Sequence, residues 1–329
     1  MGRRSAIAAV AVGLLQLVVL LTLAFAKPST EPHAAPIRIV APRVVSTTLV
    51  EHANALPGKP VNAVALGTAQ EARASVREGR SVAAIVVDLA AQTDTLYLAS
   101  ANGADLNRAV REQIDAVETS FGRKAVIRDL VPARDGDSGQ RGVYLITAAC
   151  ILTGFGVAIA IAWRRGPVAP SLAGGTGRMV GAAGISAAVG LLVGLAGFLR
   201  YDSGFAGWWL LGTLTVLAAA ATTMALESIF GVLGIGLATT LFVIEGAPLL
   251  RFTPLLLLPD PWAAIAPWLP YGSSLVAGSG QAYFGGSSIR PLLVLVVWIA
   301  VSILTLLVAR RERPEAVAGH WAFAPPKSS

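Results

Sequence analysis

Long apolar runs separated by short polar gaps dominate the chain from residue 142 to residue 309, and charged residues lie almost only in the gaps. In hydrocarbon, every backbone N–H and C=O must be hydrogen-bonded within its own segment. An apolar run of about 20 residues therefore forms a helix that crosses the ~30 Å core of a bilayer. The pattern predicts an α-helical polytopic membrane domain with spans at residues 142–163, 179–199, 207–226, 228–250 and 291–309. We expect Glu227 at a tight turn between the third and fourth of these spans.

A sixth span is predicted at the N-terminus, where the apolar residues 5–26 follow a short basic head at residues 1–4. At about 1.5 Å per residue, this helix is long enough to cross the bilayer. The sequence Ala24-Phe25-Ala26 also fits a signal-peptidase site, so cleavage before Lys27 is the alternative. The apolar run is longer than the usual signal core of about 7–15 residues, which favours an uncleaved anchor at residues 1–26.

Residues 27–141 follow a different pattern, in which short apolar runs alternate with amphipathic stretches. A β-branched run at 82–87 suits a buried strand, and the apolar residues of 104–121 recur at helical spacing. We predict strands at 37–41, 61–66, 82–87, 95–99 and 125–131, and helices at 69–79 and 104–121. These elements predict a small α/β domain inserted between the first and second spans, with residues 135–139 as a linker to the helices.

The positions of the basic residues predict the orientation of the chain. Counting crossings places three arginine-bearing segments, residues 1–4, 164–178 and 310–329, on one side of the membrane. Basic residues next to spans are enriched on the cytoplasmic side, so we expect both termini in the cytoplasm of a bacterial cell with the chain in its plasma membrane. The domain at 27–141 and the connection at 251–290 are then extracytoplasmic, and residues 310–329 form a cytoplasmic tail.

The connection at 251–290 is unusually apolar for a loop and carries many prolines among its leucines and tryptophans. Proline at this density cannot sustain one spanning helix. We therefore expect a pair of short re-entrant helices in the outer interface of the membrane domain at 142–309. The alternative, a badly formed seventh span, would place the tail outside and break the arginine bias.

Composition agrees with a membrane protein: 54% of the 329 residues are hydrophobic and only 14% are charged. A soluble domain usually has about 25% charged residues. The net charge of +7 comes largely from arginines that flank spans, so it does not predict a nucleic-acid-binding face. The single cysteine, Cys150, lies within an apolar run and excludes a disulfide framework.

Motifs for catalysis are missing from the sequence. The only Gly-Lys pair, Gly58-Lys59, is followed by proline and lacks the upstream glycine of a phosphate-binding loop. The three histidines, His33, His52 and His320, are expected on two sides of the membrane, which argues against a histidine metal site. No G-x-S-x-G motif occurs. We expect neither an enzyme nor a bound cofactor.

Polar and small residues inside the spans are candidates for function. Gly190 and Gly194 form a G-x-x-x-G motif that allows close helix packing and could also form a dimer face. Glu245 is expected near the outer end of its span, where it either reaches the interface or pairs with Arg251. The alternative is that Glu245 is an intramembrane polar residue on a substrate path.

The order of elements and several local motifs carry a resemblance to a known family. In the insert, Thr68-Ala69-Gln70-Glu71-Ala72 and residues 76–87 form a helix, a glycine stop and a strand, and residues 96–102 and 106–117 form the next strand and a long helix. Trp268-Leu269-Pro270 and residues 281–286 precede the last span. The chain thereby resembles the permease subunits of exporter-type (type-2) ABC transporters, in the branch related to phage-infection (Pip/YhgE-like) proteins.

The resemblance implies a homodimeric or paired permease that moves a hydrophobic or amphiphilic solute outward, driven by a separate ABC ATPase that docks between the second and third spans. There, Arg164, Arg165 and Arg178 border a loop without acids and either anchor the topology or bind the ATPase. This loop contains Pro167, Pro170 and a Gly-Gly pair, so it departs from a regular coupling helix. The second hypothesis is a non-transporting, membrane-anchored accessory or binding protein that displays the insert.

Overall fold

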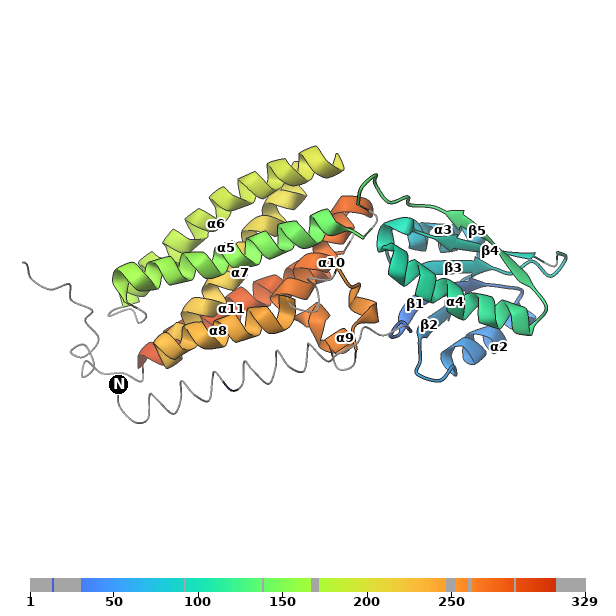
Figure 1. Cartoon of the computed structure of the whole chain (residues 1–329), viewed down its shortest axis with the longest axis horizontal. Coiled ribbons are helices and arrows are strands. Elements are labelled where there is room, and N and C mark those ends of the chain that lie inside the picture. Colours follow the sequence, from blue (N-terminus) through green and yellow to red (C-terminus); the bar gives the residue numbers. More distant parts are fainter. Residues whose placement is uncertain are drawn as a thin grey trace, which may run out of the picture.

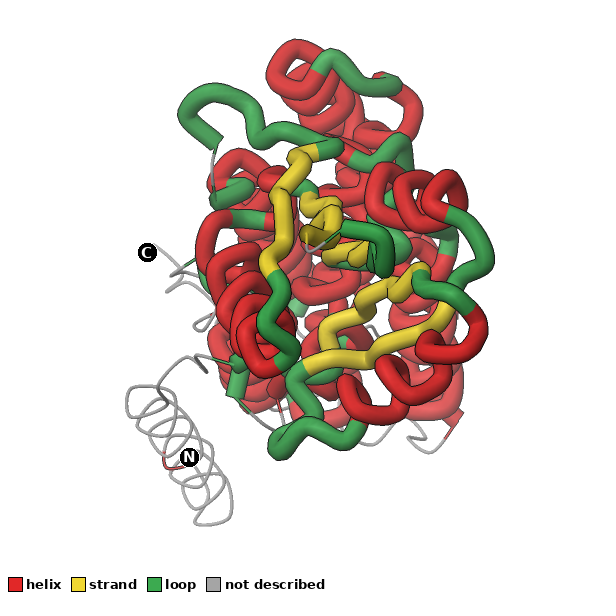
Figure 2. Tube along the Cα trace, turned by 90° about the vertical axis from the view of Figure 1, so that its right-hand side faces the viewer, coloured by secondary structure: helices red, strands yellow, loops and turns green. Residues whose placement is uncertain are grey.

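The computed structural model describes Leu14 and residues 31–91, 93–137, 139–166, 172–246, 252–259, 262–286 and 288–311. Apart from Leu14, the predicted span at 5–26 lies outside these residues, as does the predicted tail beyond residue 311. Figure 1 shows a helix bundle and an α/β domain lying end to end, and Figure 2 shows the domain in front of one end of the bundle. We call this the domain end of the bundle and the opposite end the distal end.

Five strands form one mixed sheet in the order β2-β1-β3-β4-β5. β1 (Ala35–Val40) pairs in parallel with β2 (Val61–Ala65) and β3 (Ala83–Val86). β4 (Thr93–Leu98) runs antiparallel to β3 and parallel to β5 (Lys124–Asp129). Because side chains alternate between the faces of a strand, every second residue of β1 is buried. All five strands were predicted, with ends that differ by no more than two residues.

Three helices cover the two faces of the sheet. α2 (Arg43–Asn54) and α4 (Ala104–Ser120) enclose one core with Ile37, Ile39 and Leu96, whereas α3 (Ala69–Arg77) encloses the other with Tyr97. α3 and α4 were predicted, but α2 was not. Its sequence is rich in valine and threonine, which have low helix propensity, and Ala53 is its only fully buried residue. The helix forms because two parallel strands, β1 and β2, need a crossover connection.

Four described helices are long and apolar enough to cross a membrane: α5 (Arg141–Arg165), α6 (Leu172–Tyr201), α7 (Phe205–Phe230) and α11 (Arg290–Arg311). α7 lies at the centre and contacts the other three. In its most apolar stretch, 67% of the residues are buried, against 17–33% in the other three helices. The outer helices therefore direct most of their apolar surface away from the protein, as expected for helices that face lipid.

The start of the fifth predicted span, residues 228–250, differs from the structure. α7 continues past Glu227 to Phe230, and the chain turns at Gly231, whose φ is +62°. α8 (Val232–Gly246) contributes 15 described residues, about 22 Å at 1.5 Å per residue, and residues 247–250 of the predicted span lie outside the described part of the chain. Glu227 is thus a buried residue in the last turn of α7, not a turn residue.

The proline-rich connection forms short helices at the domain end of the bundle. These are the 3₁₀ helix η3 (Leu255–Leu257), α9 (Trp262–Ile265), the 3₁₀ helix η4 (Ala266–Trp268) and α10 (Pro270–Tyr283). α10 packs against α5, α7 and α11, and most of its first turn is buried. Gly272 permits this fold, because a Cβ at that position would lie 1.9 Å from the carbonyl oxygen of Ala266. α10 therefore belongs to the bundle instead of forming a solvent loop.

Candidate functional site

Two segments of the bundle side enter the cores of the α/β domain. Leu257 belongs to the core beneath α2 and α4, and the Leu256 carbonyl accepts a hydrogen bond from the backbone N–H of His33 at 2.8 Å. Phe284, directly after α10, packs into the core beneath α3. Its ring lies against Gly79, where an added Cβ would approach Cγ of Phe284 to 2.9 Å. The domain is therefore packed onto the bundle through shared cores.

A buried carboxylate, Asp137, joins the linker to three helices at this junction. It accepts hydrogen bonds from the hydroxyls of Tyr201 (3.0 Å) and Tyr283 (2.5 Å) and from the backbone N–H of Gly142 (2.9 Å). These donors belong to the last residue of α6, the last residue of α10 and the first turn of α5. The carboxylate thus also lies at the positive end of the α5 dipole, which stabilises its charge.

Aromatic rings and arginines surround this carboxylate. The rings of Tyr201 and Trp208 stack, with their centroids 5.3 Å apart and an interplanar angle of 16°. The guanidinium groups of Arg134 and Arg200 lie 6.0 Å and 5.6 Å from the centre of the Tyr201 ring. Arg134 also donates to the backbone carbonyl of Tyr201. The domain end of the bundle is therefore held by a connected set of polar and aromatic contacts.

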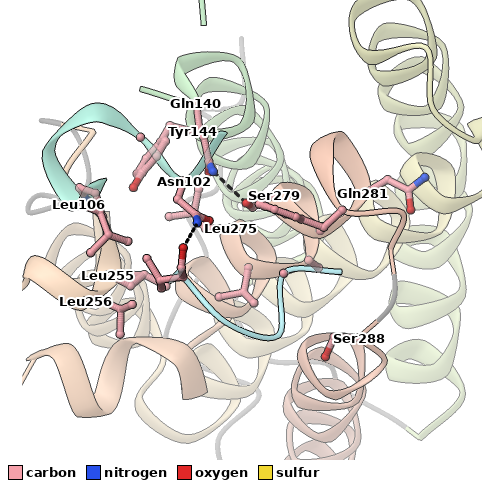
Figure 3. Close-up of a pocket in the computed structure, with 18 of the residues that line it drawn as sticks. Asn102, Leu106, Gln140, Tyr144, Leu255, Leu256, Leu275, Ser279, Gln281 and Ser288 are labelled. Carbon is pink, nitrogen blue, oxygen red and sulfur yellow. Dashed lines mark hydrogen bonds between the residues drawn. The ribbon is translucent and has the colours of Figure 1, made fainter. Parts of the chain in front are cut away.

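A cavity of about 300 Å³ lies between the domain and the bundle. Figure 3 shows that both parts of the protein contribute to its wall, which carries leucines as well as the polar side chains of Asn102, Gln140 and Ser279. Its lining includes Leu106 of α4, the η3 leucines Leu255 and Leu256, and Leu275 of α10. Pockets for small ligands have volumes of roughly 300–1,000 Å³ and are mostly apolar with a few placed polar groups. This cavity is therefore a candidate binding site.

Gln140 is positioned at the cavity by unusual backbone geometry. It precedes α5 in the left-handed conformation, with φ +55° and ψ +28°. Its side-chain nitrogen donates to the carbonyl of Ala101 in the domain (2.5 Å) and to the hydroxyl of Ser279 in α10 (2.9 Å). Gln140 therefore bridges the domain and the bundle at one wall of the cavity, and Figure 3 shows its contact with Ser279.

The three candidate coupling arginines lie far from this site. Arg164 and Arg165 are exposed at the distal end of α5, but Arg178 of α6 is buried. Arg178 donates to the carbonyls of Arg165 (2.5 Å) and Gly166 (2.8 Å), so it caps the C-terminal end of α5. Only two of the three arginines are thus exposed at the distal end. Pro167 and Pro170 of this loop lie outside the described residues.

The candidate glycines lie at the α6–α7 contact. A Cβ on Gly190 would lie 2.1 Å from Oγ1 of Thr213, and one on Gly194 would lie 2.9 Å from the ring of Phe205. This glycine face is therefore covered by α7 of the same chain, which leaves it unavailable to a second copy. Glu245 is the penultimate residue of α8, and its side chain lies outside the description, as does Arg251.

Sequence reasoning did not single out the residues that build the junction. Asp137 was interpreted only as part of a linker, and Tyr201 lies just beyond the predicted span at 179–199. Asp137 lies five residues before the predicted helix start at residue 142, outside the position of an N-terminal cap, so its spacing did not indicate a role at the helix end. Glu227 was predicted to lie in a turn, but it is buried, and one of its carboxylate oxygens accepts no hydrogen bond from the described residues.

A separate cluster of charges is buried in the α/β domain. Arg123 donates to both carboxylate oxygens of Asp94, at 2.6 Å and 2.8 Å. Burial and the neighbouring Asp94 raise the pKa of Glu118 to about 7. Burial acts in the same upward direction on Asp94, but hydrogen bonds from Arg123 and from the Asp88 N–H leave the pKa of Asp94 below its ordinary value. Searched over the described residues, no cluster of three or more His, Cys, Asp or Glu side chains could hold a metal ion.

The fold and composition define a class of protein: a multi-pass membrane protein with four candidate spans and a small α/β domain. Comparisons of the chain with protein-family models, curated proteins and solved structures gave no significant match. The particular function must therefore be argued from the site.

Proposed function

We propose that the chain is the permease subunit of an exporter-type ABC transporter, which moves a hydrophobic or amphiphilic solute outward across a bacterial plasma membrane. The observation that carries this proposal is the order of elements along the bundle. The α/β domain and α10 lie at one end, before the last long helix, while exposed arginines lie at the other end of α5. The permeases that the sequence resembles are expected to have the same order: an α/β insert, long helices, and short helices before the last span.

In this proposal the domain end is extracytoplasmic and the distal end is cytoplasmic. Residues 5–26 and α8, extended by residues that follow it, complete six spans with both termini inside. A homodimer or a paired permease would form through the outer helices, because α6 and α11 leave most of their apolar surface uncovered. ATP is hydrolysed by a separate ATPase subunit that binds at the distal end through Arg164 and Arg165.

The second candidate is a non-transporting membrane protein that displays the α/β domain for binding. The position of Arg178 favours this alternative. Arg178 faces inward and holds the end of α5, and only residues 166–171 connect α5 to α6. The connection available to an ATPase between these helices is thus only six residues long.

Purification of the tagged chain from membranes of its native host tests the two candidates. An ABC ATPase recovered in a fixed ratio with the chain, and stimulated by an amphiphilic solute when both are reconstituted in vesicles, is the expected result. Recovery of the chain without any ATPase, under conditions that keep a known ABC transporter of the same membrane intact, would refute the permease proposal.

A further inference from the structure

We propose that the cavity between the α/β domain and the helix bundle binds an uncharged amphiphile, with a single hydrocarbon chain and a head group that donates hydrogen bonds. The cavity would be the site of the amphiphilic solute of the proposed function, but binding does not require transport or an ATPase.

The apolar part of the wall is suited to a hydrocarbon chain. Leu210 of α7 and Val276 of α10 both line the cavity and remain 44% and 38% exposed. Further leucines from η3 and α10 extend this surface (Figure 3). Removing such surface from water is favourable by roughly 25 cal/mol per Å². A hydrocarbon chain would cover apolar side chains that the protein itself leaves uncovered.

The polar part of the wall offers acceptors without charge. Both hydrogens of the Gln140 side-chain nitrogen are used, by Ala101 and Ser279, and among the described residues the Gln140 side-chain oxygen accepts no hydrogen bond. The Asn102 side-chain nitrogen donates to the Val82 carbonyl at 3.4 Å, and its oxygen likewise has no donor in this part of the chain. A hydroxyl or amide N–H of a ligand would satisfy these oxygens.

The charges at the cavity disfavour an anionic head group. Two acids, Glu78 and Asp105, lie among the lining residues, and both are exposed. Each forms an ion pair with a neighbouring arginine, Arg80 at 2.6 Å and Arg108 at 3.0 Å, so the pairs contribute little net charge. Because no arginine or lysine is among the described residues that line the cavity, a phosphate would gain no cationic partner from them.

The cavity lies at the level expected for lipid head groups. Trp268 is half-exposed, the guanidinium of Arg290 lies 4.5 Å from the centre of its ring, and the indole N–H of Trp298 donates to its carbonyl at 2.9 Å. Tryptophan and arginine together are typical of the membrane interface. Ser288 and Leu292, on either side of Arg290 in the sequence, line the cavity. An amphiphile in the bilayer is therefore at the right depth to enter.

Photolabelling of the full chain in phosphatidylcholine nanodiscs tests this site. The probe is a monoacylglycerol with a photoreactive group on its acyl chain, and labelled residues are mapped by mass spectrometry. We expect labels concentrated in residues 252–259 and 270–283, displaced by unlabelled monooleoylglycerol and not by phosphatidylglycerol. Labels spread over the lipid-facing sides of α6 and α11, or equal displacement by phosphatidylglycerol, would overturn the proposal.

Two variants that fill the cavity from opposite walls have matched controls. Val276→Trp on α10 is compared with Val297→Trp on α11, and Ala104→Trp on α4 with Ala116→Trp on the same helix. All four positions are exposed, but only Val276 and Ala104 line the cavity. We expect both cavity variants to weaken probe binding at least about tenfold and the controls to leave it unchanged, with the melting temperature confirming that each variant folds. Wild-type binding by both folded cavity variants would refute the site.

Discussion

The hydroxyl of Tyr283 donates a 2.5 Å hydrogen bond to the carboxylate of Asp137, across 146 residues of sequence. Tyr283 ends α10, and Asp137 lies in the linker that leads from the α/β domain into α5. The contact fixes the short helices before the last long helix to the strand-bearing domain. Because Asp137 also binds Tyr201 at the end of α6, one carboxylate holds the domain end of the bundle together.

Asp137→Asn should lower the melting temperature of the full chain. An amide cannot accept from two hydroxyls and a backbone N–H as a carboxylate does, and each hydrogen bond to a charged group contributes about 1.5–3 kcal/mol. Thermal unfolding in detergent, followed by tryptophan fluorescence, measures the effect. Asp135→Asn is the control, because Asp135 is exposed two residues away. Equal melting temperatures for the two variants would contradict the structural role of Asp137.

Glu118 should make the stability of the chain fall as pH rises. Its pKa is about 7 in the folded domain, above the ordinary value of 4.5, so the folded state holds a proton that the unfolded state has lost. Its contribution to the free energy of unfolding is therefore complete below pH 4.5 and is lost as pH rises through 7. Between these values the free energy of unfolding falls with a slope that approaches about 1.4 kcal/mol per pH unit. Melting temperatures measured between pH 5 and pH 8 report this slope.

Glu118→Gln should flatten that pH dependence, because glutamine stays neutral across the whole range. Glu112→Gln, on the exposed side of the same helix, should retain it. If the slope persists in Glu118→Gln, another group titrates in this range and the assignment to Glu118 is wrong.

Gly190→Ala should destabilise the bundle without changing its oligomeric state. The added methyl group would lie 2.1 Å from Thr213 Oγ1 and 2.8 Å from the backbone carbonyl of Trp209, so α6 and α7 must separate. Overpacking of this kind costs about 1–3 kcal/mol. Gly184→Ala is the control on the same helix, since no atom lies within 4 Å of its added Cβ. A loss of dimer with unchanged unfolding temperature would instead indicate a dimer face.

Arg178 and the exposed arginine pair should have separate roles. Arg178→Gln removes two hydrogen bonds to the last carbonyls of α5 and should lower the melting temperature. Arg164→Gln combined with Arg165→Gln should leave that temperature nearly unchanged, since both side chains are exposed. If the pair binds an ATPase, the double variant should reduce its co-purification. Unchanged co-purification and export by this correctly inserted variant would exclude a coupling role.

The proposed topology can be tested with single cysteines. Ser120→Cys on α4 and Ser288→Cys before α11 should react with a membrane-impermeant maleimide in intact cells, and Ser171→Cys should react only after the cells are opened. Ser120 and Ser288 are exposed, and the native Cys150 is buried and should stay unlabelled. Labelling of Ser171→Cys in intact cells would overturn the orientation.

Local pattern determined much of the fold. An apolar run such as 142–163 has to form a helix wherever it lies in hydrocarbon, because its backbone groups have no other partners. Alternating and β-branched runs likewise predicted the five strands, since successive side chains of a strand point to opposite faces whatever its neighbours are. These features depend on residues close together in the sequence.

The candidate site depended on contacts that local pattern does not contain. Asp137 and Tyr283 meet only because α10 folds back beside α5, and Arg178 faces inward only because α6 returns alongside the end of α5. The crossover helix α2 also depends on a long-range contact. Its own helix propensity is weak, and it forms because the parallel pairing of β1 and β2 requires a crossover between them. Spacing along one helix or strand can place a residue on a face, but the identity of the group opposite is decided by long-range packing. The cavity, whose wall is formed by the α/β domain and the helix bundle together, could be found only in the tertiary structure.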